Sequence, residues 1–282
     1  MINTLISLNA DLASSIALRY SCRLMELVDM RLQGIHVEEV EKEGYPPGSG
    51  WVRGTWEKGL LNIARDEISQ LINAEKSSCP QLSSSIIRIG DRDEELLREI
   101  QQESYDLLVE GVLNTFDAQL FNKKVRSKLY RSAPCPIILV KNLTDPGRVA
   151  LLMEDLKDVK PLLSTFLKLF DKTKLTVDLV CFTAKKSNQE EFKKKVTESK
   201  AAGLGDAGQV LTEANSLLAS HGWSPRESWI IQDLPQRIGE ILGEEYGLVG
   251  ARIPRNAGKR RLVMDLLGRV PSATLLANNR GR

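Results

Sequence analysis

One pattern that occurs twice constrains the fold of this chain more than any other feature of its sequence. In each half an apolar stretch ends at a glycine, a polar loop and a helix-compatible segment follow, and a proline stands just before the last apolar stretch. Gly111 lies 23 residues before Pro134, and Gly250 lies 21 residues before Pro271. An internal repeat explains this agreement better than chance, so we expect two copies of one α/β unit in tandem.

Strand-like and helix-like segments alternate along both halves. Short β-forming runs bounded by Gly or Pro predict strands, and apolar residues three and four positions apart predict amphipathic helices. The first half has predicted strands at 2–8, 32–40, 85–89, 107–109 and 136–140, and predicted helices at 14–30, at 59–74, after a cap at Asp93 and around 125–130. The second half has predicted strands at 149–153, 175–183, 228–232, 246–249 and 274–277, and predicted helices at 161–170, 189–220 with a break at 203–205, 234–242 and 260–267.

This order of elements favours βαβ units and a mainly parallel sheet in each half. A length of 282 residues also suggests two domains. The polar stretch around Pro146 and Gly147 is typical of a linker. We therefore predict a first domain at 1–142, a linker at 143–148 and a second domain at 149–282.

Composition and charge exclude several functional classes. A net charge of +2 and a pI near 8.3 are far from the strong positive field of a dedicated nucleic-acid-binding protein. No apolar stretch approaches the roughly 20 residues that cross a bilayer. The N-terminus lacks the basic start and apolar core of a signal peptide, so we expect a cytoplasmic protein.

The cysteines and histidines show no pattern of a metal or disulfide site. The cysteines are scattered, with no CxxC pair and no histidine at ligand spacing; they are Cys22, Cys79, Cys135 and Cys181. We therefore expect reduced, buried cysteines and neither a disulfide scaffold nor a structural zinc ion. No Ser/His/Asp set emerges either, so the sequence predicts no catalytic residue.

Several stretches of the first half resemble the universal stress proteins, in the form that carries two such domains on one chain. The stretches are Asn9-Ala10-Asp11 with Ser14 to Tyr20, Gly34 to Val37, Arg88 to Leu97, Tyr105 to Gly111, and Ser132 to Val140. Together they cover most of residues 1–142. The second half resembles the family only in the order of its elements and in the segments around Gly250 and Pro271.

This resemblance implies two tandem doubly wound domains, each with a five-stranded parallel sheet of the adenine nucleotide alpha hydrolase-like, or Rossmann-like, kind. It implies a crevice between the first and fourth strands, which holds ATP in many members. ATP-binding members have an acidic residue at the end of strand one. After strand four they have Gly-x2-Gly-x9-Gly-Ser/Thr, whose glycines let backbone N–H groups approach the phosphates.

The first half departs from that motif. Asn9 stands at the acidic position, and Gly111 is kept. Asn114 replaces the second glycine, and Lys123-Lys124 replaces Gly-Ser/Thr. Bulky side chains crowd the backbone where phosphates normally approach, so the resemblance implies a degenerate site in this half.

The second half departs differently. Glu154 or Asp155 supplies a carboxylate, Gly250 is kept, and Ile253 falls at the position of the second glycine. The loop is shortened and basic, and the candidate site residues on it are Arg252, Arg255, Asn256, Gly258, Lys259, Arg260 and Arg261. Two readings stay open: these cations attract phosphate by charge, or they are solvated residues of a site that lost its role.

Two functional hypotheses follow from these observations. The first is a non-enzymatic tandem universal stress protein that acts in stress response or regulation by binding an unidentified protein partner or a ligand. The alternative is a nucleotide-binding switch or weak ATPase that uses the atypical site of the second half, with ATP or another adenine nucleotide as ligand. The resemblance also predicts that the last strands, 136–140 and 274–277, pair within the chain, and it leaves a homodimer open.

Overall fold

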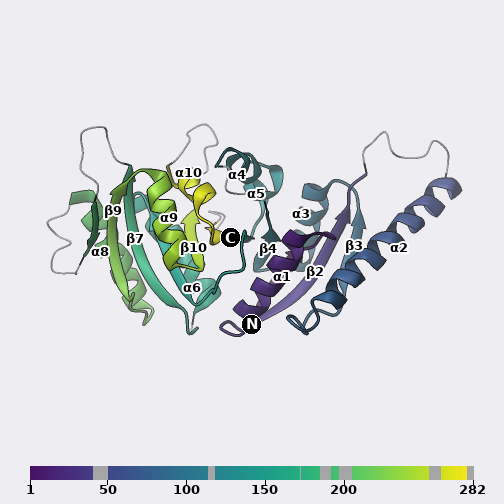
Figure 1. The fold of residues 1–282 in the computed structure, drawn as a ribbon, viewed down its shortest axis with the longest axis horizontal. Helices are drawn as coiled ribbons and strands as arrows, with labels where there is room; N and C mark the ends of the chain where they lie inside the picture. Colours follow the sequence, from purple (N-terminus) through teal and green to yellow (C-terminus); the bar gives the residue numbers. More distant parts are fainter. Residues whose placement is uncertain are drawn as a thin grey trace.

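The computed structural model describes residues 1–40, 50–113, 118–171, 173–184, 192–196, 205–253 and 262–277. Within these residues one sheet of eleven strands runs through the whole molecule, in the order β3-β2-β1-β4-β5-β11-β10-β6-β7-β9-β8. Figure 1 shows the two halves of the chain side by side along the longest axis, with helices packed on the sheet. The chain is therefore an α/β protein of two tandem doubly wound domains.

The first domain follows the predicted alternation. Its elements are β1 (Ile2–Ser7), α1 (Leu12–Met25), β2 (Met30–Glu38), α2 (Trp51–Ala74), β3 (Ser85–Ile89), α3 (Arg92–Glu103), β4 (Leu107–Gly111), α4 (Ala118–Val125), α5 (Lys128–Ser132) and β5 (Ile137–Val140). All five strands are parallel. The strand order reverses between β1 and β4, which makes the space beyond their carboxyl ends the expected ligand crevice.

The second domain repeats this plan and adds one strand. Its elements are β6 (Arg148–Met153), α6 (Leu156–Phe170), β7 (Thr176–Ala184), β8 (Phe192–Lys195), α8 (Gly205–Ser220), β9 (Glu227–Asp233), α9 (Pro235–Glu245), β10 (Leu248–Arg252), α10 (Leu262–Arg269) and β11 (Ala273–Ala277). The corresponding switch point lies between β6 and β10. β6 begins at Arg148, one residue inside the predicted linker.

Strand β8 corrects the sequence prediction, because its residues were assigned to a charged helix. β8 pairs antiparallel with β9 at the edge of the sheet. The Lys193 Nζ lies 2.5 Å from Glu245 and 4.6 Å from the ring centre of Trp229, and the Lys195 Nζ lies 2.6 Å from Glu227. The alternation of lysines and glutamates along the sequence predicted the exposed face of a helix. In the structure the partners of these lysines lie on β9 and α9, and lysines are common on edge strands.

Helix and strand boundaries needed smaller corrections. α1 ends at Met25 and not at residue 30. The cap of α3 is Asp91, whose side chain accepts a hydrogen bond from the backbone N–H of Glu94 at 3.0 Å. The predicted cap, Asp93, instead accepts from the N–H of Leu129 at the start of α5, at 3.0 Å. A carboxylate in the first turn of α3 thus accepts from the first turn of α5, a helix packed beside it.

The hydrophobic core on each face of the sheet continues across the two domains. One face is covered by α1, α2, α6 and α8, and its buried residues include Ile138 and Leu275. The other face is covered by α3, α4, α5, α9 and α10, and its buried residues include Leu139 and Leu276. Strands buried on both faces read as continuous apolar runs, which is why β5 and β11 were readable from sequence.

The last strands of the two domains join the sheet. β5 and β11 pair antiparallel, with Ile138 opposite Leu275. Beside this pair, α4 packs on α10 so closely that a Cβ added at Gly268 would lie 2.7 Å from the Cα of Ala118. The Asn122 side chain donates a hydrogen bond to Asp265 at 3.1 Å. We call this region, β5 with β11 and α4 with α10, the domain seam.

A buried lysine crosses the domain seam directly after β5. The Nζ of Lys141 donates to the carbonyl oxygens of Leu267 and, at 2.9 Å, Val270, at the end of α10. It also lies 4.7 Å from the ring centre of Phe121 on α4. Burial lowers the pKa of Lys141 to about 7. The cation–π contact and the carboxyl end of the helix dipole favour its charged form, which burial opposes.

The expectation of four reduced cysteines is wrong for one pair. Cys22 of α1 and Cys79, in the segment after α2, form a disulfide with 5.4 Å between their Cα atoms. They are 57 residues apart in sequence, so only the packing of α1 against the end of α2 brings them together. Cys135 and Cys181 are buried thiols outside this disulfide, and burial raises the pKa of each thiol to about 12, which makes them poor nucleophiles.

Candidate functional site

The switch point of the first domain lies at the ends of β1 and β4, and the start of α1 is next to it. Asp11 caps α1 by accepting a hydrogen bond from the N–H of Ser14 at 2.8 Å. The N–H of Asn9 donates to the Ser14 hydroxyl oxygen at 2.7 Å. Two backbone N–H groups at this strand end and helix start, those of Asn9 and Ser14, are therefore engaged by side chains of the chain itself.

Gly111 is required here for a contact within the protein. A Cβ added at this position would lie 2.0 Å from the carbonyl oxygen of Ala13, in the first turn of α1. No side chain fits at that distance, so only glycine lets β4 end against α1. The glycine that the resemblance assigned to phosphate binding thus has a structural explanation.

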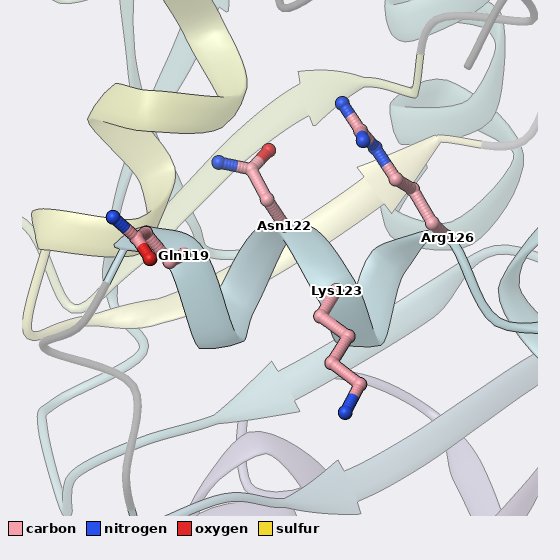
Figure 2. Close-up of a pocket in the computed structure, with 4 residues that line it drawn as sticks. All are labelled: Gln119, Asn122, Lys123 and Arg126. Carbon is pink, nitrogen blue, oxygen red and sulfur yellow. The ribbon is translucent and has the colours of Figure 1, made fainter. Parts of the chain in front are cut away.

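The two predicted cations of α4 lie in different surroundings. The Lys124 Nζ is 2.5 Å from Glu110, a buried residue of β4. Lys123 is exposed and, with Gln119, Asn122 and Arg126, lines a shallow surface depression of about 380 Å³. Figure 2 shows Lys123 directed to a different side of α4 from Asn122 and Arg126. The two lysines therefore do not face a common site.

Glu110 is the centre of a polar cluster that the sequence prediction missed. Its carboxylate accepts hydrogen bonds from Arg92 at 2.6 Å, from Lys124 at 2.5 Å and from the hydroxyl of Tyr130. Arg92 also donates to the hydroxyl of Ser7, at the end of β1, at 3.1 Å. We call these five residues the Glu110 cluster. A charged residue after the apolar run Leu107-Leu108-Val109 was the available signal, because a carboxylate in a buried strand needs partners.

The electrostatics of the Glu110 cluster favour its charged state. Burial of Glu110 opposes ionisation, but the charges of Arg92 and Lys124 outweigh burial and lower the pKa of the carboxyl group. Burial and the hydrogen bond to Glu110 raise the pKa of Tyr130 well above its ordinary value, so the phenol stays protonated and donates a hydrogen bond to the carboxylate. The cluster is therefore an ionised carboxylate held by two cations and one neutral donor.

In the second domain the strand registers show which residue takes the place of Gly111. Gly111 pairs with Val140, the last residue of β5. Arg252 pairs with Ala277, the last residue of β11. Arg252, and not Gly250, therefore occupies the position of Gly111 at the end of the fourth parallel strand. The predicted strand end at Gly250 is wrong.

Gly250 lies inside β10, away from the strand end. A Cβ added there would lie 2.9 Å from the Cδ2 of Leu151 and 3.7 Å from the Cδ1 of Leu162 on α6. Both atoms are ends of flexible side chains. Gly250 therefore packs against the apolar face that α6 covers, which a search for glycine after an apolar run cannot distinguish from a strand end.

Arg252 folds over the start of α6. Its Nη1 donates to the carbonyl oxygen of Lys157 at 2.7 Å and lies 3.4 Å from the carboxylate of Asp158. Its Nε is buried and has no hydrogen-bond partner among the described residues. Asp155, predicted as a ligand residue, caps α6 by accepting from the N–H of Lys157 at 2.9 Å. The N–H of Glu154 donates to Asp158 at 3.3 Å.

Several predicted site residues lie outside the described part of the chain. They are Asn114 in the first domain and Arg255, Asn256, Gly258, Lys259, Arg260 and Arg261 in the second. Within the described ranges no group of three or more His, Cys, Asp or Glu side chains could hold a metal ion. In the same ranges no helix is long and apolar enough to span a membrane.

Comparison with solved structures supplies the fold relationship. A universal stress protein from Archaeoglobus fulgidus DSM 4304 matches 98% of this chain over 96% of its own length, with a TM-score of 0.58 and 11% identity. The chain has the fold of a tandem universal stress protein. A functionally unknown protein from Pseudomonas aeruginosa PAO1 matches 99% of this chain over 92% of its own length, with a TM-score of 0.58 and 13% identity. No family model matches the sequence, and no curated protein matches it.

The tandem universal stress protein fold confirms the architecture that the resemblance implied. Both solved structures align with nearly the whole chain, so the similarity in fold includes both domains. At 11–13% identity the comparison shows the fold, and the roles of individual residues rest on the geometry described above.

Proposed function

We propose that this chain is a tandem universal stress protein that acts in stress response or regulation by binding and not by catalysis. The observation that carries the proposal is the first-domain crevice. There Gly111 ends β4 directly against Ala13, and the cation that could have met a phosphate, Lys124, is bound to Glu110. Among the described residues, this backbone contact and this ion pair leave Gly111 and Lys124 unavailable to a nucleoside triphosphate.

We propose that any retained ligand site belongs to the second domain. Its candidate residues are Glu154, Asp155, Gly250, Arg252, Asn256, Gly258, Lys259, Arg260 and Arg261. Arg252 supports this assignment because its guanidinium reaches the start of α6 while its Nε stays buried without a partner. The ligand class that fits a guanidinium at a helix start is an oxyanion, such as the phosphate of an adenine nucleotide.

The same observation supports the second candidate function, a nucleotide-dependent switch or weak ATPase in the second domain. The two functions differ in turnover and not in the location of the site. Hydrolysis requires a positioned water molecule and stabilisation of the charge on the transferring phosphoryl group. The cations on the loop after β10 would supply that stabilisation.

Calorimetry of the purified protein with ATP and with AMP tests the proposal. A companion measurement identifies any nucleotide released when the protein is denatured. We expect no nucleotide in the first domain and, where binding occurs, its loss in the variant R252M and in R260A/R261A, with K123M as a matched control. Efficient ATP turnover that R260A/R261A abolishes would show that the non-enzymatic proposal is wrong.

We also propose how the domains and the chain assemble. We propose a first domain at 1–142 and a second at 149–282, with Arg148, the first residue of β6, at their junction. In dimers of single-domain chains, the last strands of two chains pair with each other. Here β5 and β11 make this contact within one chain, which supports a monomer that completes its sheet without a second copy. Light scattering after size exclusion distinguishes this from a homodimer, and cell fractionation tests the proposed cytoplasmic location. Capture experiments would identify the protein partner.

A further inference from the structure

The end of α2 is held against α1 by two contacts that lie one helical turn apart. Ser15, Arg19 and Cys22 follow one another at spacings of four and three residues, so they lie on one face of α1. On the other side, Glu75 caps the end of α2, and the N–H of Cys79 donates to the Glu75 carbonyl oxygen at 2.8 Å. The same face of α1 therefore meets the end of α2 twice, once at Glu75 and once at Cys79.

The contact at Glu75 is noncovalent and satisfies the buried carboxylate by itself. The side chain of Glu75 is 5% exposed. Its two oxygens accept hydrogen bonds from Arg19, Nε at 2.6 Å and Nη2 at 2.9 Å, and from the hydroxyl of Ser15. A bidentate guanidinium is a strong partner for a carboxylate. This contact can therefore hold the end of α2 on α1 whether or not the disulfide is formed.

The remainder of α2 buries little apolar surface. Figure 1 shows the helix along the outer edge of the first domain, beside β3. All 24 residues of α2 are described, and the buried ones are Ala64, Ile68 and Ile72, whereas Trp51 is 81% exposed. A helix with few buried apolar contacts opens locally at low free energy. The attachment of α2 therefore depends strongly on the contacts at its end.

The disulfide between Cys22 and Cys79 lies beside an open surface depression. The depression has a volume of about 280 Å³ and is lined by Met25, Gln81 and residues at the start of β2 and just before β3. The Oε1 of the exposed Gln81 side chain lies 3.6 Å from the Sγ of Cys22. Cys22 is 5% exposed and Cys79 is 1% exposed. Cys22 is therefore the sulfur that a small thiol in the depression can attack.

We propose that Cys22 and Cys79 form a reversible thiol–disulfide exchange site for small thiols of the glutathione class, and that this site controls how firmly α2 is attached to α1. A glutathione thiolate attacks the Sγ of Cys22, the bond to Cys79 breaks, and Cys79 leaves as a thiolate that takes up a proton. A second glutathione thiolate attacks the glutathione sulfur of this mixed disulfide. Oxidised glutathione leaves, and the Cys22 thiolate takes up a proton. The site gains two electrons and two protons, and the reverse sequence restores the disulfide.

Reduction changes the attachment of α2 and leaves the domain folded. In the disulfide form the end of α2 is held at Cys79 and at Glu75, and in the dithiol form at Glu75 alone. The end of α2 and the segment up to residue 84 then open more often, while the core of the sheet is unchanged. This regulation goes beyond the proposed function, because it needs no nucleotide and no residue of either switch point.

Equilibration of the purified protein with glutathione tests this inference. The protein is held in buffers whose ratios of reduced to oxidised glutathione cover the cytosolic range, and after an acid quench its thiols are alkylated in denaturant and counted by mass spectrometry. Because the chain has four cysteines, we expect two thiols at the most oxidising ratios and four at the most reducing ones. The curve should be the same from either direction. Two thiols at every ratio would identify a permanent structural disulfide and overturn the inference, and so would four thiols at every ratio.

Hydrogen–deuterium exchange measures the attachment of α2 in the two redox forms. In peptides covering residues 68–84 we expect the amide exchange rate of the wild type to rise about fivefold on reduction. C135A/C181A keeps the reactive pair and should show the same rise. C22A/C79A should show the faster rate in both buffers. Equal rates in the oxidised and reduced wild type overturn the inference, and so does a redox-dependent rate in C22A/C79A.

The variant E75Q tests whether the two contacts hold the same helix end. Glutamine keeps the size of the side chain and removes the charge that binds Arg19. Reduction of E75Q then releases the second of two contacts, so it should lower the Tm by roughly 2–4 °C more than reduction of the wild type does. An equal decrease in both proteins overturns the proposed control of α2. Calorimetry with ATP is a separate measurement, so failure of this inference and failure of the proposed function are distinguishable.

Discussion

The switch points of the two domains occupy the same position in two copies of one sheet, and the residues at their strand ends carry opposite charges. In the first domain β4 ends at Gly111 against the backbone of α1, and an anion, Glu110, is enclosed by cations. In the second domain β10 ends at Arg252, a cation that lies over the acidic first turn of α6. The comparison teaches that an equivalent strand end fixes where a site lies, while one or two residues decide the sign of the charge it holds.

The largest expected effect separates the two glycines. In G111A the new Cβ meets the Ala13 carbonyl oxygen at 2.0 Å, and backbone cannot yield as a side-chain tip can. We expect a loss of about 3 kcal/mol or more in the free energy of unfolding, measured by urea denaturation. In G250A the Cβ meets flexible side-chain ends, the nearest of them the Cδ2 of Leu151 at 2.9 Å, so the loss should stay below about 1 kcal/mol. Equal losses would contradict the assignment of different roles.

The next effect separates the two lysines of α4. K124M leaves the buried carboxylate of Glu110 with fewer partners, which should lower the free energy of unfolding by about 1–3 kcal/mol. K123M alters an exposed residue and should change it by less than about 0.5 kcal/mol. Chemical denaturation of both variants in the same buffer makes the comparison. A K123M loss as large as that of K124M would contradict the Glu110 cluster.

A pH effect tests the domain seam that joins the two copies. Folded Lys141 has a pKa of about 7, whereas an unfolded lysine has about 10.4. Between these values the unfolded state binds more protons, so stability should rise with pH, by at most about 1.4 kcal/mol per pH unit. Urea midpoints from pH 7 to pH 9.5 measure this slope, and K141M should reduce it. An unchanged slope in K141M would assign the dependence to other groups.

The smallest effect concerns the second crevice. R252M removes a guanidinium that donates to the Lys157 carbonyl and lies near Asp158, and its side chain is 13% exposed. We expect a loss of about 1 kcal/mol, because methionine keeps most of the packing and the Nε has no partner to lose. Thermal unfolding with and without AMP checks it. A much larger loss would show that Arg252 is a structural residue comparable to Glu110.

The sequence by itself determined the architecture of this protein. Strands buried on both faces give continuous apolar runs, helices between them give a second periodicity, and prolines mark the entry to each last strand, so the tandem α/β order was readable. The resemblance placed the crevice, and the registers agree that the fourth parallel strand borders it. These features were predictable because each depends on residues close together in the chain.

Only the tertiary structure decided which residues meet. Lys193 and Lys195 lie on a strand because β9 and α9 supply their partners, and Cys22 meets Cys79 because α1 packs beside the end of α2. Register placed Arg252, and not Gly250, opposite the last residue of its neighbouring strand. The Glu110 cluster needs three helices and two strand ends to converge, and no local spacing encodes such an approach. Local sequence specifies periodicity, but the charge and closure of a site depend on long-range contacts.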